Sequence, residues 1–156
     1  MHDFGGYEIS EKIYENERTM MFRGRVADSK EPVLIKVYKE ANDTNEMTAY
    51  MYDFEMASKL HIKGVQKPAK FERFRQTYAF IFPDVKGQCL RKYVEQKNSE
   101  NIIEPLEIAI RLAEIVERMH EQGIVHGNLR LDDIFVSSKT KEVRIIGFYP
   151  SQQLSR

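Results

Sequence analysis

The stretch IVHGNLRLDDIFV, Ile124–Val136, and the stretch VRIIGF, Val143–Phe148, decide the fold of this chain. They follow the segment with the strongest helical pattern, Pro105–Glu121, in which a proline opens the helix and Gly123 stands just beyond its end. The helix carries a wide apolar face, which predicts that it is heavily buried. That face consists of Leu106, Ile108, Ala109, Leu112, Ile115, Val116 and Met119.

Strand patterns dominate the first third of the chain. Tyr7–Tyr14 and Thr19–Val26 flank the polar stretch Glu15–Arg18, which predicts a hairpin. The apolar run PVLIKVY, Pro32–Tyr38, predicts a third strand with one lysine inside it.

A helix and two further strands complete this part of the chain. The helix is predicted over residues 45–60, with a buried stripe of Tyr52, Met56, Ala57 and Leu60. Two strands follow at Ala69–Phe74 and Tyr78–Phe82, and a last strand is predicted at Val143–Ile146. Strands with one helix, followed by helices with a short hairpin, indicate an α+β fold.

Composition excludes several classes of protein. The chain has 24 Lys+Arg and 24 Asp+Glu residues and therefore no formal net charge, which argues against a nucleic-acid-binding or membrane-binding surface. No apolar stretch approaches the roughly 18 residues of a membrane span, and no signal peptide is visible. The single cysteine, Cys89, cannot form an internal disulfide. These features predict a cytoplasmic domain.

Several sequence motifs stand in the order and spacing of protein-kinase motifs. Val33–Lys36 (VLIK), Ile124–Val136 and Val143–Phe148 correspond to V-A-I-K, H-R-D-L-x-x-x-N and D-F-G. The chain thus resembles a degenerate member of the protein kinase-like superfamily over nearly its whole length. The phrases KIYENERTMMFRG and YAFIFPDV resemble most the N-terminal Ser/Thr kinase-like domain of bacterial multi-sensor hybrid histidine kinases. The H-G-N and G-F pair also resembles the mixed-lineage kinase domain-like pseudokinase of vertebrates, which the rest of the chain fits less well.

The resemblance implies two lobes. Residues 1–84 would form an N-lobe with a five-stranded antiparallel sheet and one helix. Residues 85–156 would form the hinge and a truncated, mostly helical C-lobe that ends just after the D-F-G equivalent. A complete kinase fold continues for roughly another 100 residues by family resemblance. We therefore expect either a piece of a larger protein or missing contacts that another chain supplies.

The resemblance also implies that the phosphoryl-transfer residues are degenerate. His126 is kept, but Asn128 replaces the aspartate base and Gly147 replaces the metal-binding aspartate of D-F-G. An amide cannot accept the substrate proton near neutral pH, and a positioned base is typically worth about 10²–10⁴ in rate. Arg130 replaces a lysine near the transferred phosphate. Asp133 replaces the metal-binding asparagine, where it could bind Mg²⁺, be solvated or cap the backbone.

Lys36 occupies the position of the phosphate-pairing lysine. A lysine inside an apolar strand needs a partner, and helical spacing favours Asp53 for this role, with Glu55 as the alternative. The simpler interpretation is that Lys36 is an interior cation that serves the fold. The loop over the phosphates, Tyr14–Thr19, has no glycine and two glutamates, so it predicts an ordinary solvated hairpin tip.

Bulky residues stand where adenine would bind. Leu34 shares a strand face with Lys36 and replaces the usual alanine, Phe82 corresponds to the gatekeeper, and Phe135 to the floor of the pocket. Large side chains at all three positions would fill the pocket from within. The hinge equivalent at Val85 keeps its backbone N–H, so ATP with Mg²⁺ is disfavoured rather than excluded.

These residues predict a catalytically inactive, regulatory or protein-interaction domain in signal transduction, without a cofactor. Its partners would be another protein or adjoining signalling domains, not nucleic acid, and the truncated C-lobe face would also allow a homo-oligomer. Two alternatives stay open. One is an atypical phosphotransferase that uses Asp133 and Arg130, and the other is a nucleotide sensor without turnover.

Overall fold

The computed structural model contains two compact units. The first comprises Met1–Lys59 and Lys67–Asp84, and the second comprises Leu60–Gln66 and Val85–Arg156. The segment Leu60–Gln66 belongs to the second unit, because its strand pairs with a strand of that unit. The structure describes residues 4–39, 44–74, 77–97, 101–147 and 152–153.

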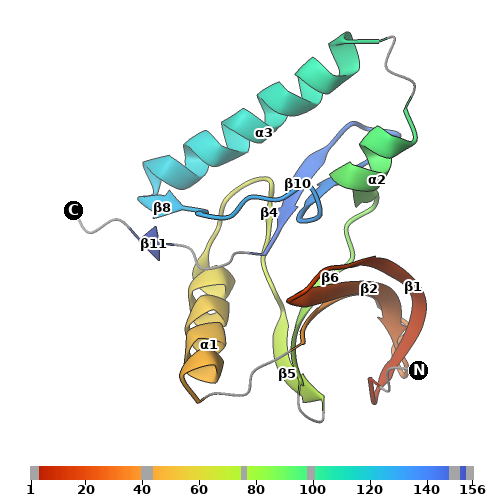
Figure 1. The fold of residues 1–156 in the computed structure, drawn as a ribbon, viewed down its shortest axis with the longest axis vertical. Helices are drawn as coiled ribbons and strands as arrows, with labels where there is room; N and C mark the ends of the chain where they lie inside the picture. The colour runs from red at the N-terminus through yellow and green to blue at the C-terminus, as the bar shows by residue number, and fades with distance from the viewer. Residues whose placement is uncertain (1–3, 40–43, 75–76, 98–100, 148–151, 154–156) are drawn as a thin grey trace. The chain divides into compact units, whose positions relative to one another are not determined.

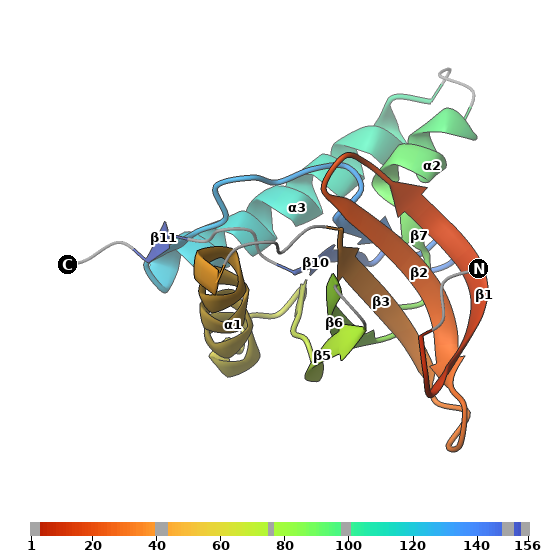
Figure 2. The same ribbon diagram turned by 60° about the horizontal axis from the view of Figure 1, so that its bottom comes forward.

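The first unit is a five-stranded antiparallel sheet with one helix, as the sequence predicted. Its strand order is β1-β2-β3-β6-β5, and β1 and β2 curl strongly in Figure 2. The elements are β1 (Tyr7–Glu15), β2 (Thr19–Val26), β3 (Pro32–Tyr38), α1 (Thr44–Lys59), β5 (Lys70–Phe74) and β6 (Thr77–Pro83).

The two faces of this sheet bury different side chains because residues alternate along each strand. One face holds an apolar cluster of Phe4, Met20, Phe22, Val33, Ile35, Val37, Ala79 and Ile81. On the other face α1 packs through aromatic rings. Tyr50 lies 4.4 Å from Tyr38 and Phe54 lies 5.6 Å from Phe80, measured between ring centroids.

The buried stripe predicted for α1 is wrong in part. Tyr52 is 55% exposed, while Tyr50, Asp53 and Ala57 are buried. The sheet presents aromatic rings to α1, so the helix turns Tyr50 and Phe54 toward them. Of the predicted stripe, Ala57 is the residue that is fully buried, and it lies on the same side of the helix as Tyr50 and Asp53.

The second unit combines two helices with short strands (Figure 1). A four-stranded sheet has the order β4-β10-β9-β7, and β8 pairs with β11. The elements are β4 (Val65–Gln66), β7 (Gln88–Cys89), α2 (Leu90–Glu95), α3 (Ile103–Glu121), β8 (Ile124–Val125), β9 (Ile134–Val136), β10 (Val143–Ile146) and β11 (Gln152–Gln153).

The long helix α3 starts two residues earlier than predicted, and the Asn101 side chain accepts a 3.0 Å hydrogen bond from the N–H of its first residue, Ile103. The expectation of a heavily buried helix is also wrong. Ile108, Ile115 and Met119 are buried, but Leu106 and Ile110 are 54% and 59% exposed. Only one side of α3 packs against β8 and β10. The predicted apolar face extends beyond this packed side, so part of it is exposed.

No helix among the described residues is long and apolar enough to cross a membrane.

Candidate functional site

Strand β3 carries the N-lobe part of the candidate site. In the register of β3 and β6, Leu34 stands opposite Phe82 and Lys36 stands opposite Phe80. Opposed residues share a sheet face, so Leu34 and Phe82 are neighbours on the face that also holds Lys36. Leu34 and Phe82 are fully buried and Lys36 is 3% exposed. The sequence prediction that Leu34 and Lys36 share a face is confirmed by this register.

The helix α1 places the two candidate acids differently. Glu55 is exposed and binds Lys59 at 2.5 Å, one turn along the helix. Asp53 is buried, and burial raises the pKa of its carboxyl to about 6. A cation at ion-pair distance would lower that pKa instead. The ion pair of Lys36 with Asp53 stays a prediction, and the raised pKa of Asp53 does not favour it. The alternative partner, Glu55, is paired with Lys59.

The tip of the β1–β2 hairpin is held by side chains where a nucleotide-binding loop would need bare backbone. The Asn16 side-chain oxygen accepts hydrogen bonds from the backbone N–H groups of Arg18 and Thr19 at 3.0 and 2.8 Å. Lys12 and Lys39 bind the Glu15 carboxylate at 2.8 and 2.5 Å and lower its pKa to about 2. The tip is therefore a closed polar turn, as predicted, with the charge of Glu15 offset by two lysines.

In the second unit, the catalytic-loop and D-F-G equivalents meet. The buried His126 ring places Nε2 3.1 Å from the Gly147 carbonyl oxygen. Gly127 and Gly147 have φ angles of +74° and +78°, a left-handed conformation that glycine adopts without cost. Phe148, which ends the D-F-G equivalent, lies outside the described residues.

The remaining catalytic-loop residues divide into exposed and buried ones. Asn128 and Arg130 are exposed, and Asp133 is 5% exposed. The Asp133 N–H donates to the Arg130 carbonyl at 3.0 Å, and its own carbonyl accepts from the Ile146 N–H at 2.7 Å. The backbone of Asp133 therefore ties the loop to β10. Whether its carboxylate binds Mg²⁺ stays a prediction.

An ion pair beneath the loop was missed by the sequence reasoning. The buried Asp132 accepts hydrogen bonds from Arg91 of α2 at 2.7 and 3.2 Å. The two residues are 41 positions apart, so no local spacing could have joined them. Asp132 thus holds α2 against the loop.

The other two pocket equivalents also belong to the second unit. Phe135 is 1% exposed in β9, opposite Cys89 of β7 and Arg144 of β10, and Val85 is 7% exposed. Within the described ranges, no group of three or more His, Cys, Asp or Glu side chains could hold a metal ion. Leu34, Phe82 and Phe135 are each buried within their own unit. Their roles as pocket residues, like that of Val85, stay predictions.

Comparisons with known proteins agree with this fold. Among the solved structures that this chain resembles, two share 18% sequence identity with it. The autoinhibited serine kinase domain of the giant muscle protein titin matches with a TM-score of 0.69 over 99% of this chain and 48% of its own. Rad53 1-466 in complex with AMP-PNP matches with a TM-score of 0.75 over 94% of this chain and 39% of its own. The chain thus spans about half or less of these structures, and at this identity they show the fold alone.

Sequence comparison identifies the family. The search of curated proteins found no match. A family model described as protein tyrosine and serine/threonine kinase matches residues 7–154, which is nearly the whole chain. The chain belongs to the protein tyrosine and serine/threonine kinase family.

Proposed function

We propose that this chain is a catalytically inactive kinase-like domain, a pseudokinase, with a regulatory or protein-interaction role in signal transduction. The observation that carries the proposal is the pair Asn128 and Gly147. His126 brings the two motifs that contain them together through its 3.1 Å contact with Gly147. The family resemblance gives each of the two positions an aspartate, and this chain has neither.

Loss of the first aspartate removes the proton acceptor. Phosphoryl transfer depends on a residue that orients the attacking hydroxyl and takes its proton. The Asn128 side chain is a neutral amide that cannot take the proton near pH 7. The neighbouring Arg130 cannot accept the proton either, because its guanidinium group stays protonated in proteins.

Loss of the second aspartate removes the principal metal ligand. Mg²⁺ bridges the phosphates in a kinase and offsets their charge. Gly147 contributes a backbone carbonyl, and His126 contacts that carbonyl. Asp133 is then the one carboxylate that the family resemblance assigns to the metal, and Mg²⁺ is commonly held by one or two carboxylates together with phosphate oxygens and water.

The bulk of the side chains at the adenine-site equivalents argues that this chain binds nucleotides poorly. Leu34 and Phe82 are adjacent and fully buried on the β3–β6 face, which leaves little room for a planar base on that face. The closed hairpin tip around Asn16 also withholds the backbone N–H groups of Arg18 and Thr19 from a phosphate. We therefore propose that no cofactor is required.

The retained Lys36 favours a second candidate, a nucleotide sensor without turnover. Lys36 stands in β3 at the position that the family resemblance gives to the phosphate-pairing lysine, and a nucleotide phosphate bound there would use its charge. The third possibility, an atypical phosphotransferase, would need Asp133 and Arg130 to act without a base. The resemblance to bacterial hybrid sensor kinases supports adjoining signalling domains as partners and a cytoplasmic location.

Thermal unfolding with ATP, with and without Mg²⁺, separates these functions. A ligand at 100 times its dissociation constant adds about 2.7 kcal/mol to the free energy of unfolding. We expect no shift for the wild-type chain. A shift that does not need Mg²⁺ would replace our proposal by the sensor, and a Mg²⁺-dependent shift with loss of the γ-phosphate would overturn it.

Two cavity-forming variants test the filled-pocket argument. Leu34→Ala should open the face that carries Lys36 and so gain an ATP-induced shift. Val33→Ala removes volume from the opposite face of the same strand and should gain none. Equal responses of the two variants to ATP would contradict the role given to Leu34.

A further inference from the structure

Arg23 of β2 lies in the same cross-strand row as the two adenine-site equivalents of the first unit. It stands opposite Leu34, which in turn stands opposite Phe82. Opposed residues share a sheet face, so Arg23 belongs to the face that also carries Lys36. Its neighbour Phe22 belongs to the apolar cluster of the other face. A charged side chain thus lies beside two bulky apolar ones on the face where adenine would bind.

The Arg23 guanidinium is held by two carboxylates. Its Nε donates to the Asp84 carboxylate oxygens at 3.1 and 3.3 Å, and its Nη1 donates to Glu11 at 3.3 Å. The Asp84 N–H donates to the Pro32 carbonyl at 3.1 Å, which anchors Asp84 beside the start of β3. The side chains of Arg23 and Asp84 are 24% and 17% exposed, so their ion pair is largely shielded from solvent.

The ion pair of Arg23 with Asp84 forms a bridge over β3. Strand β3 lies between β2 and β6, and Asp84 directly follows the last residue of β6. Neighbouring strands are about 4.8 Å apart, so β2 and β6 are separated by roughly 10 Å, which the two side chains span together. Because Arg23 is opposite Leu34, the bridge crosses β3 beside the Leu34 side chain.

We infer that this bridge excludes a nucleotide base from the face that carries Lys36, as a second barrier beside the bulk of Leu34. The inference rests on the proposed function and names the ion pair that closes the candidate site. The hinge equivalent Val85 follows Asp84 directly in the chain, so a base that lay on Leu34 and used the Val85 N–H would have to displace the bridge. An uncharged base offers no replacement for an ion pair, so its binding would bear the cost.

Adenosine tests the inference, because it carries the base without the charged phosphates. Isothermal titration calorimetry on the 156-residue chain would compare Leu34→Ala with two double variants, which add Arg23→Ala or Asp84→Ala to it. We expect each double variant to bind adenosine roughly fivefold more tightly than Leu34→Ala does, as the loss of one ion pair predicts. Equal affinity of the three proteins would overturn the inference.

The opposite charges of the two partners separate exclusion from other roles. Tighter adenosine binding after Asp84→Ala with weaker binding after Arg23→Ala would make Arg23 a ligand of the base and overturn the inference. Arg25→Ala, added to Leu34→Ala, is the matched control. Arg25 lies on the same strand but pairs with Glu8 of β1 at 3.8 Å, so its ion pair does not cross β3. It should leave adenosine affinity unchanged, and a gain equal to that of Arg23→Ala would contradict the role of the bridge.

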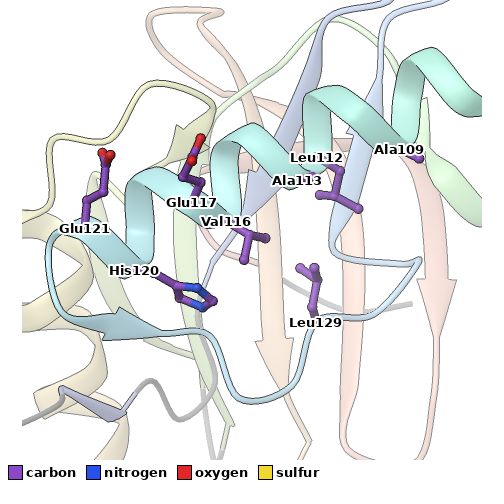
Figure 3. A pocket seen from close by; sticks show the side chains of 8 residues that line it. All are labelled: Ala109, Leu112, Ala113, Val116, Glu117, His120, Glu121 and Leu129. Carbon is purple, nitrogen blue, oxygen red and sulfur yellow. The ribbon is translucent and has the colours of Figure 1, made fainter.

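A second control addresses binding of the base to apolar surface elsewhere. The helix α3 lines an open groove of about 580 Å³, to which Leu112, Val116 and Leu129 contribute (Figure 3). Leu112→Ala removes the same aliphatic volume as Leu34→Ala does. It should gain no adenosine binding, either alone or with Arg23→Ala. A gain would place the base outside the first unit and overturn the inference.

Folding and turnover are measured on the same proteins. Circular dichroism checks folding, and Arg23→Gln or Asp84→Asn breaks the same ion pair with less loss of volume, with the same expected gain, where an alanine variant does not fold. A double variant that binds adenosine tightly but releases no γ-phosphate from ATP supports both the bridge and the proposed inactivity. Release of γ-phosphate would overturn the inactivity alone, since the adenosine comparison decides the bridge by itself.

Discussion

Asp53 is a buried carboxyl of the first unit, and its electrostatics bear on the role of Lys36. Burial raises the pKa of Asp53 from 3.8 to about 6. The folded state thus binds this proton more tightly than the unfolded state does. Stability should fall as the pH rises from about 4 to about 6, by at most about 3 kcal/mol at 1.36 kcal/mol per pKa unit.

Asp53→Asn should remove this pH dependence and raise the midpoint of urea unfolding at pH 7, because the amide carries no charge to bury. Glu55→Gln, an exposed acid on the same helix, is the matched control. If Lys36 and Asp53 instead formed a buried pair, Asp53→Asn would destabilise the chain at pH 7, and the stability of the wild type would rise with pH.

At the scale of elements, a cluster around Glu104 joins α2, α3 and the β9–β10 turn. Lys141, Tyr93 and Lys97 all bind the Glu104 carboxylate, Lys97 at 2.9 Å. These bonds lower the pKa of Glu104 to about 2. The cluster thus stabilises the fold above the ordinary pKa of 4.5 and loses its effect as the pH falls toward 2.

Glu104→Gln should therefore lower the unfolding temperature at pH 7, and the difference from the wild type should shrink as the pH drops below 4.5. Glu107→Gln, an exposed acid one turn along α3, should change little at either pH. Thermal unfolding followed by circular dichroism measures both. A Glu104→Gln deficit that persists unchanged near pH 2 would show that the ion pairs are not its cause.

Strand alternation explains why much of the N-lobe could be predicted. A period of two places Leu34 and Lys36 together whatever surrounds them. The face of α1 could not be assigned in this way, since Tyr50 and Tyr52 both fit helical stripes and only the aromatic rings of the sheet select Tyr50. The ion pair of Arg91 with Asp132 joins residues that are far apart in the sequence, so no local sequence pattern predicts it.

At the scale of the whole molecule, the chain has the kinase family's order of motifs without two of its carboxylates. Family membership follows from the match over residues 7–154. Inactivity is our proposal and follows from Asn128 and Gly147. Under this proposal the fold outlasts the activity, because the backbone of the two motifs is held by contacts such as those of the His126 ring and the Asp133 carbonyl.

Transfer of labelled γ-phosphate from ATP tests the central proposal most directly. The wild-type chain, Lys36→Met and Asp133→Ala would each be incubated with ATP and Mg²⁺ or Mn²⁺, and both protein labelling and phosphate release would be counted. We predict that the wild type does not exceed either variant. Labelling or release by the wild type that both substitutions abolish would contradict the proposal and establish this chain as an active phosphotransferase.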